Sequence, residues 1–209
     1  NNRLWTWGDN QYGQIGDGTT NDSYGAKLIE IGGNWYKQVS AGGSHTAAIR
    51  VADGSLWTWG LNSVGQLGDG TTINKSSPVK IGTSSWSMAN GGGYTTLAID
   101  STGALYTWGL GAAIGDGTIV SKSSPVQIGT SSWSMVASGT LTRALTINND
   151  LFLWGDGSYS GFGDGTTGSK SSPVFLNSLQ KYISIGYGNP NVVADGIQYS
   201  YIRSDGSLF

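Results

Sequence analysis

The chain has 209 residues, of which only 11% are charged, and its net charge of −2 provides no basic surface to hold a phosphate backbone. It contains no cysteine, which excludes disulfides and thiolate metal sites, and no apolar run approaches the roughly 20 residues of a membrane-spanning helix. Nine Trp, ten Tyr and four Phe offer too much burial for a disordered chain. We therefore expect a folded protein that binds no nucleic acid and does not insert into a membrane.

The first predicted strand, Leu4–Gly8, begins a pattern that the chain repeats. Leu-Trp-Thr-Trp-Gly at this strand returns with small changes at Leu56–Gly60, Leu105–Gly109 and Leu151–Gly155. Gly-Asp-Gly-Thr follows each copy at 16–19, 68–71, 115–118 and 163–166, and Ser-Ser-Pro-Val occurs at 76–79, 123–126 and 171–174. The steps between the second aromatic of each copy, Trp7 to Trp59 to Trp108 to Trp154, are 52, 49 and 46 residues. Such a period is typical of propeller blades and solenoid units.

Within one repeat, the residues from Val39 onward predict four short strands. Strand formers up to Val51 are followed by an Asp53-Gly54 turn and by Leu56–Trp59, which together predict a hairpin. The Gly-rich segment 61–70 predicts a structured loop, Pro78–Ile81 a third strand, and Trp86 the start of a fourth. Because no segment shows helical periodicity, we predict an all-β fold, a β-propeller of four-stranded blades.

We interpret residues 1–209 as a single propeller repeat array of about four repeats. The repeats span approximately 4–55, 56–104, 105–150 and 151–207. Leu208-Phe209 has the same phase in the repeat as Leu4-Trp5, so we expect the chain to be an excerpt of a longer protein.

The repeated tryptophans are predicted to fill the wedge between neighbouring blades. A four-stranded blade cannot bury both of its faces alone, and large flat side chains suit that gap. Burying one indole contributes a few kcal/mol at about 25 cal/mol per Å². We expect one inter-blade layer of Trp7, Trp59, Trp108 and Trp154, and a second layer of Trp35, Trp86 and Trp133.

In these motifs the sequence resembles the regulator of chromosome condensation repeat family, in a phage- or bacterial-type member. The resemblance rests on Gly42–Thr46, Gly54, Trp57–Gly60 and Asn62–Gly68 and extends over nearly the whole chain. It implies a β-propeller, usually of seven blades, so the visible repeats are expected to form part of a seven-bladed ring. It also implies a platform for protein binding. Repeat three departs from the pattern because the step from Gly109 to Gly115 is six residues, against eight in the other repeats.

Candidate chemical groups in the repeat have structural interpretations. A Ca²⁺ loop needs several charged oxygen ligands, whereas each Gly-Asp-Gly-Thr loop has one carboxylate, so we expect that Asp to cap its own turn. These residues are Asp17, Asp69, Asp116 and Asp164. The one histidine, His45, aligns with Tyr94 and roughly with Leu141 in the later repeats, which favours a packing role over a catalytic one. We predict no catalytic residue, no metal and no cofactor.

Binding residues are expected where the repeat is broken, because the fold already explains the repeated ones. The longest break, residues 186–200, carries Tyr187, Asn189, Asn191 and Tyr199. Aromatic loops of this kind make good contact surfaces. Tyr12 and Tyr24 are non-repeated aromatics of repeat one and complete the predicted binding set.

These observations predict a non-enzymatic binding or assembly module. Low charge and close repetition suggest a virion or tail-associated protein with a structural or host-recognition role. The expected partners are other proteins, such as virion or surface assembly subunits, or a host surface receptor or glycan. The expected location is a virion or the extracellular or cell surface, with the cytoplasm left open. The alternatives are a propeller resembling a guanine nucleotide exchange factor, an enzyme-inhibitory propeller and a bacterial surface adhesin.

Overall fold

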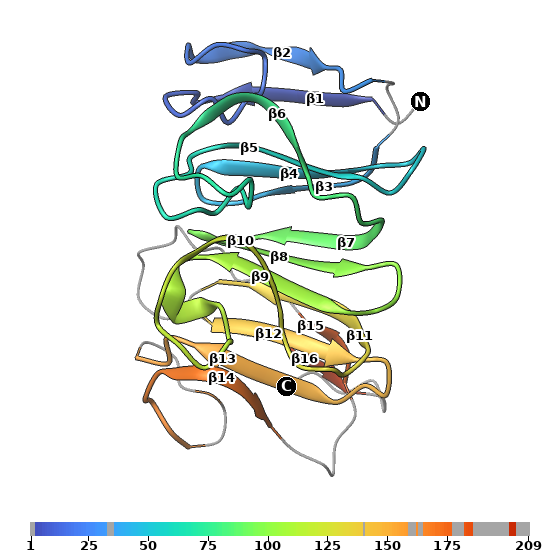
Figure 1. Cartoon of the computed structure of the whole chain (residues 1–209), viewed down its shortest axis with the longest axis vertical. Helices are drawn as coiled ribbons and strands as arrows, with labels where there is room; N and C mark the ends of the chain where they lie inside the picture. The colour runs from blue at the N-terminus through green and yellow to red at the C-terminus, as the bar shows by residue number, and fades with distance from the viewer. Residues whose placement is uncertain are drawn as a thin grey trace.

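The described chain consists of antiparallel sheets stacked side by side. The computed structural model describes residues 3–32, 36–139, 141–158, 162 and 165–176, and the backbone of 182–185 and 201–203. In this part of the chain, three four-stranded and two two-stranded sheets form, so the all-β prediction is confirmed. They follow one another along the long axis in Figure 1, from β1–β2 near the N-terminus to β13–β14 and β15–β16. No helix among these residues has the length and apolar character needed to span a bilayer.

The bounds of the elements follow the repeat. The first two-stranded sheet is β1 (Leu4–Gly8) and β2 (Ser23–Ile29). The four-stranded sheets are β3 (Tyr36–Ala41), β4 (His45–Arg50), β5 (Leu56–Gly60) and β6 (Lys75–Ile81); β7 (Trp86–Gly91), β8 (Thr95–Asp100), β9 (Leu105–Gly109) and β10 (Lys122–Gln127); and β11 (Trp133–Ser138), β12 (Leu141–Thr146), β13 (Leu151–Gly155) and β14 (Lys170–Phe175). The short 3₁₀ turn η1 (Gly111–Ala113) lies between β9 and β10, and β15 (Tyr182–Ile185) pairs with β16 (Tyr201–Arg203).

Each four-stranded sheet spans the boundary between two sequence repeats. In the β3–β6 sheet, β3 and β4 come from the end of the repeat 4–55, and β5 and β6 come from the repeat 56–104. Below, the first two strands of each four-stranded sheet are its inner strands and the last two are its outer strands. A hairpin connects β4 to β5 at this boundary and pairs Ile49 with Leu56. A sheet therefore cannot form from one sequence repeat alone, which couples each repeat to its neighbour.

The repeated tryptophans join adjacent sheets through a shared contact. Trp59, Trp108 and Trp154 are fully buried. Their indole N–H groups donate to backbone carbonyls of the preceding sheet, at Gln14 (2.9 Å), Gln66 (2.9 Å) and Ala113 (3.0 Å). The glycine that opens the neighbouring Gly-Asp-Gly-Thr motif lies against the same ring. A Cβ placed on Gly16, Gly68 or Gly115 would lie 2.6 Å from the indole nitrogen.

The second tryptophan layer lies nearer the other end of the sheets. Trp86 and Trp133 are 4% exposed and make edge-to-face contacts with Tyr106 (5.4 Å between ring centroids) and Phe152 (5.3 Å). Trp35 lies outside the described residues. Together the two layers fill the wedge between sheets with aromatic surface, which favours a fan of sheets over a flat stack.

Trp7 corrects one expectation. It was predicted to lie in the buried layer with Trp59, but its side chain is 65% exposed. The buried members each pack against a loop of the preceding sheet, and within the described residues β1–β2 has a neighbouring sheet only on the β3–β6 side. The same motif therefore occurs once exposed and three times buried, which provides a matched control within one chain.

Candidate functional site

One end of the sheets carries the long loops and is called the loop face below. It is formed by the described residues of the loops 9–22, 61–74, 110–121 and 156–169 and by the turns that join the inner strands of each sheet, such as 42–44 and 92–94. These loops and the 3₁₀ turn η1 project on the left in Figure 1. In the loops 9–22 and 61–74, a single Asn (Asn10 or Asn62) holds the loop through several hydrogen bonds. In the loop 61–74, Asn62 donates to the carbonyls of Thr71 and Ile73 and accepts from the amide of Leu67.

The repeated aspartates of the loop face cap their own turns, as predicted. Asp69 Oδ1 accepts from the amide (2.9 Å) and the hydroxyl (2.7 Å) of Thr71, and Asp17 and Asp116 make the same pair of contacts with Thr19 and Thr118. Partial burial acts to raise the pKa of Asp69, but the hydrogen bonds from Thr71, Asn62 and Lys75 together outweigh it and hold the pKa below its ordinary value. Asp164 lies outside the described residues.

The loop face is hollowed where repeat three departs from the pattern. Leu61–Leu67 has seven residues between Gly60 and Gly68, whereas Leu110–Ile114 has five between Gly109 and Gly115. Gly111 takes the place of the organising Asn62. Its amide donates to Ser121 Oγ (3.2 Å), as the amide of Asn62 donates to Asn74 Oδ1 (2.8 Å). Because Gly111 has no side chain, its backbone lies so close to Ile119 that a Cβ would clash with the Ile119 carbonyl.

A cleft of about 380 Å³ opens beside this shortened loop, and we call it the repeat-break cleft. It is lined by Tyr94, Leu110, Ala112 and Asp156, together with Gly43, Gly93 and Gly139. Thr95 also lines the cleft, and its hydroxyl is 3.0 Å from the buried hydroxyl of Ser138. This contact joins two neighbouring sheets, β7–β10 and β11–β14.

Two of the cleft's residues are exposed apolar groups at positions set by the repeat. Tyr94 is 52% exposed and Leu110 is 41% exposed. The amide of Leu110 donates to the Tyr94 carbonyl (2.9 Å), as the amide of Leu61 donates to the Ser44 carbonyl (2.9 Å). Tyr94 is therefore the structural counterpart of Ser44. Ile119 and Val120, in the same loop 110–121, are also exposed.

Asp156 provides the carboxylate of the cleft. It directly follows β13, as Leu110 directly follows β9. Its Oδ1 accepts from the amide (3.0 Å) and hydroxyl (2.5 Å) of Ser158 and from the hydroxyl of Ser169 (3.3 Å). The Ser158 hydrogen bonds lower the pKa of Asp156, so the group is ionised at neutral pH.

The predicted binding residues lie elsewhere. Tyr187, Asn189, Asn191 and Tyr199 are outside the described residues. Tyr24 is 97% exposed on β2, and Tyr12 is half-buried in the loop 9–22. Neither residue lines the repeat-break cleft. Sequence reasoning did not single out Tyr94, Leu110 or Asp156 as site residues, although the shortened step in repeat three was a visible signal for their neighbourhood.

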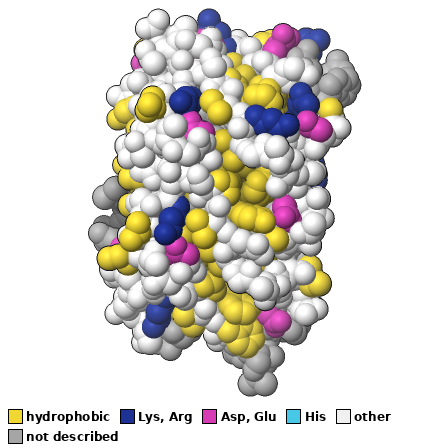
Figure 2. Space-filling view, viewed as in Figure 1, with side chains coloured by type: hydrophobic (Ala, Val, Ile, Leu, Met, Phe, Trp, Pro, Cys, Tyr) yellow, Lys and Arg dark blue, Asp and Glu magenta, His cyan; other side chains and the backbone are white. Residues whose placement is uncertain are grey.

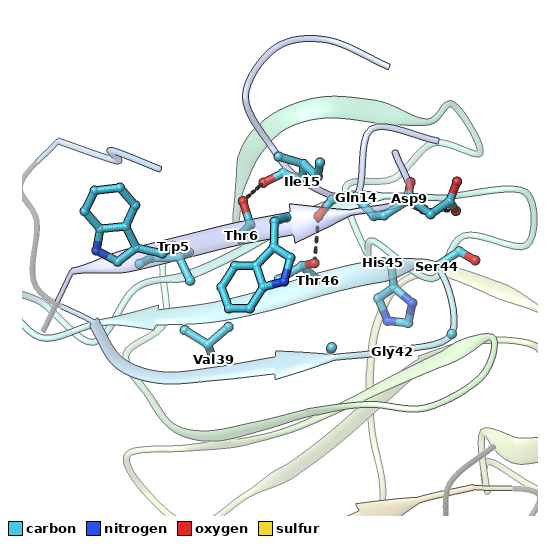
Figure 3. A pocket seen from close by; sticks show the side chains of 14 residues that line it. Trp5, Thr6, Asp9, Gln14, Ile15, Val39, Gly42, Ser44, His45 and Thr46 are labelled. Carbon is cyan, nitrogen blue, oxygen red and sulfur yellow. Dashed lines mark hydrogen bonds between the residues drawn. The ribbon is translucent and has the colours of Figure 1, made fainter. Parts of the chain in front are cut away.

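A second hollow of about 320 Å³ lies along β1 (Figure 3). Trp5 extends from β1 on the side of Val39, and His45 lies at the far end. Trp7 also lines the hollow. The strand equivalent to β1 in the next sheet is β5, and β4 pairs with it along the edge that is open on β1. The shape of this hollow therefore follows from the two-stranded pairing of β1 and β2 in the described chain.

His45 is a buried packing residue. It is 1% exposed, and its Nε2 is 2.9 Å from the hydroxyl of Thr96, which itself donates to the Gln66 carbonyl (2.7 Å). Since the Thr96 hydrogen is used in that bond, Nε2 carries the proton and donates. The strand pairing matches His45 with Gly60 and Thr95 with Gly109, so Thr95, and not Tyr94, is its counterpart in the next sheet.

A pH dependence of stability follows from the burial of His45. Burial lowers its pKa from 6.5 to about 4, so the unfolded chain binds a proton first as the pH falls. Stability should be unaffected by this group above about pH 6.5 and should fall between pH 6.5 and 4. We expect a loss of about 2 kcal/mol in the free energy of unfolding between pH 7 and pH 5.

Urea unfolding of the wild type and of His45→Leu at the two pH values measures this effect. Leucine is a suitable replacement because Leu141 occupies the same position in β12. The variant should lack most of the pH dependence. An equal loss of stability in both proteins would assign the effect to other groups.

Comparison with known proteins identifies the repeat. The Regulator of chromosome condensation (RCC1) repeat model matches residues 1–49 and 53–99, and a second model of that repeat matches residues 36–66. The Ultraviolet-B receptor UVR8 of Arabidopsis thaliana is 38% identical over 79 residues, which cover 37% of this chain and 18% of the receptor.

Solved structures share the fold over the whole described length. Human WBSCR16 superposes with a TM-score of 0.78 at 22% identity, covering 100% of this chain and 57% of that one. Yeast RCC1 (Prp20), in its crystal structure with Kap60, superposes with a TM-score of 0.77 at 20% identity, covering 98% of this chain and 50% of that one. The chain thus spans about half the length of these propellers and a smaller part of the receptor. The fold is that of an RCC1-type β-propeller, with about four blades in this chain.

Proposed function

We propose that this chain, whose repeats and fold support membership of the RCC1 β-propeller family, is a non-enzymatic protein-interaction module that binds its partner on the loop face. One relative with this fold, yeast RCC1 (Prp20), is bound to Kap60 in its crystal structure. The observation that carries the proposal is the repeat-break cleft with its exposed Tyr94 and Leu110. Partly exposed aromatic groups beside a rigid pocket are typical anchors of protein interfaces.

The surface seen in the direction of Figure 1 is poor in charge. Figure 2 shows few charged side chains on the face it presents, with basic and acidic groups scattered and apolar groups between them. The sequence is poor in charge and rich in glycine. Its motifs repeat from sheet to sheet, whereas the shortened loop 110–121 departs from the repeat. The biological setting we propose is a virion, tail or cell-surface assembly, in which the module joins structural subunits or contacts a host surface.

The substitution Tyr94→Ser tests this function. Serine occupies the same position in the preceding sheet, at Ser44, so the fold should tolerate it. We expect the immobilised protein to bind its partner from the native source at least 10-fold more weakly, which corresponds to about 1.4 kcal/mol, because an anchor residue is removed. The unfolding temperature should remain within about 2 °C of the wild type, since Tyr94 is half-exposed.

Tyr24→Ser is the matched control, because it removes a more exposed tyrosine from β2, away from the cleft. It should leave partner binding unchanged. Weaker binding by Tyr24→Ser with no effect of Tyr94→Ser would move the interface to β2 and reject the cleft. Recovery of virion or surface proteins in the bound fraction would support the proposed setting, and recovery of soluble GTPases alone would reject it.

A further inference from the structure

The lining of the repeat-break cleft combines one carboxylate with apolar walls. All three hydrogen bonds that hold Asp156 reach Oδ1, from Ser158 and Ser169. The second oxygen, Oδ2, is used by none of them. Asp69 and Asp116, by contrast, are paired through Oδ2 with Lys75 (3.4 Å) and Lys122 (3.1 Å). Within the part of the chain that the structure describes, Oδ2 of Asp156 is therefore an acceptor open to a cation of a partner.

The walls suit a long side chain that ends in a charge. Tyr94 and Leu110 offer exposed apolar surface along which a methylene stem can lie. A guanidinium or ammonium group close to the Tyr94 ring would also gain a cation–π contact, which contributes about 0.5–1 kcal/mol at an exposed site. A cleft of about 380 Å³ has room for one such side chain and part of the adjoining backbone.

The charge of the loop face favours a basic partner. Within the described residues, its loops carry six aspartates, and the outer strands that follow them begin with three lysines, which gives a balance of −3. The aspartates are Asp9, Asp17, Asp22, Asp69, Asp116 and Asp156, and the lysines are Lys75, Lys122 and Lys170. Complementary charge steers association and selects among partners.

We propose that the repeat-break cleft binds a basic side chain, lysine or arginine, of an extended segment of the partner protein, with the cation at Asp156 and its stem between Tyr94 and Leu110. This inference rests on the proposed function and adds the chemistry of the bound segment. The cation approaches Oδ2 of Asp156, while Ser158 and Ser169 hold the carboxylate in place through Oδ1.

NMR titration with short peptides tests the inference. The probe is acetyl-Gly-Arg-Gly-amide, and acetyl-Gly-citrulline-Gly-amide is a neutral analogue of nearly the same shape. We expect the arginine peptide to shift the signals of Gly93, Tyr94 and Asp156 with millimolar affinity. The corresponding lysine peptide, acetyl-Gly-Lys-Gly-amide, should do the same. The citrulline peptide should bind at least 5-fold more weakly, because its side chain carries no charge to pair with Asp156.

Two variants locate the charge. Asp156→Asn should weaken the arginine peptide at least 5-fold, whereas Asp9→Asn, which removes one charge from the same face outside the cleft, should change its affinity less than 2-fold. Equal binding of the citrulline peptide, or no effect of Asp156→Asn, would overturn the inference. Shifts at the same residues with maltose and none with arginine would make the cleft a glycan site and also overturn it.

The two proposals fail separately. If Tyr94→Ser reduces partner binding and Asp156→Asn does not, the interface stands and the basic side chain is rejected. If neither variant reduces partner binding, the loop-face function itself is rejected. A supporting result requires that both variants weaken the partner and that Asp9→Asn leaves it nearly unchanged.

Discussion

Replacing Trp108 by alanine should lower the free energy of unfolding by about 3–5 kcal/mol, the largest effect we expect from one substitution. The indole is fully buried between the β3–β6 and β7–β10 sheets, packs near Trp86 at 6.2 Å between ring centroids, and donates to the Gln66 carbonyl. Its loss leaves a cavity and removes one of the two donors to the Gln66 carbonyl, which keeps the Thr96 hydroxyl. Urea denaturation followed by far-ultraviolet circular dichroism measures the change.

Trp7→Ala is the control, since it removes the same residue from the same motif. Its side chain is 65% exposed, so the loss of stability should stay within about 0.5 kcal/mol. A large effect of both substitutions would show that Trp7 is buried in solution. Small effects of both would contradict the view that these indoles hold the sheets together.

Gly68→Ala should destabilise the chain by about 3 kcal/mol. Gly68 has φ of +79°, where an L side chain is strained, and an added Cβ would lie 2.6 Å from the Trp108 nitrogen and 2.8 Å from its Cε2. Both the backbone and the ring would have to shift. We therefore expect the unfolding midpoint to fall by an amount similar to that for cavity-forming core substitutions.

Gly82→Ala separates backbone strain from steric contact. Gly82 also has a positive φ, +60°, but a Cβ there would meet no atom within 4 Å. Its cost should be about 1 kcal/mol, that of the left-handed backbone alone. Equal costs at Gly68 and Gly82, measured by chemical denaturation, would show that the contact with Trp108 carries no additional energy.

The fold was predictable because its determinants repeat. A Trp-Gly strand, an Asp-Gly turn and a Gly-Asp-Gly-Thr loop recur with one period, and each is explained by a contact that also recurs, such as the indole of Trp59 against Gly16. The exposure of Trp7 was not predictable from its motif, because burial depends on a neighbouring sheet and not on local sequence.

The candidate site was less predictable because it arises from residues that are distant in sequence. Tyr94 and Asp156 line one cleft although more than sixty positions separate them. Aligning the repeats by sequence also matched Tyr94 with His45, because the run Gly91-Gly92-Gly93 leaves the alignment of the turn ambiguous by one residue. Only the pairing of Thr95 with Gly109 fixes it.

A buried charge was also missed. Arg143 is 0% exposed in β12, at the position that Ala47 and Leu97 occupy in the other sheets. Those two residues belong to apolar clusters, so the sheet β11–β14 differs from its neighbours in the chemistry of its inner strand. Nothing in the surrounding motif predicts an arginine there.

The most direct test of the account is to restore the regular loop in repeat three. Replacing Leu110–Ile114 by the sequence of Leu61–Leu67 returns the organising asparagine and adds two residues beside the cleft. The graft replaces Gly111 together with the whole shortened loop that brings it close to Ile119, so the longer loop takes the backbone path of Leu61–Leu67. It should fold, because Gly65 of the original loop packs against Ser123, and the corresponding Ser171 is present in β14. Partner binding and unfolding temperature are then measured on one preparation. We predict at least 10-fold weaker binding with an unchanged or higher unfolding temperature, whereas full binding by the folded graft would contradict the claim that the break in the repeat is the interaction site.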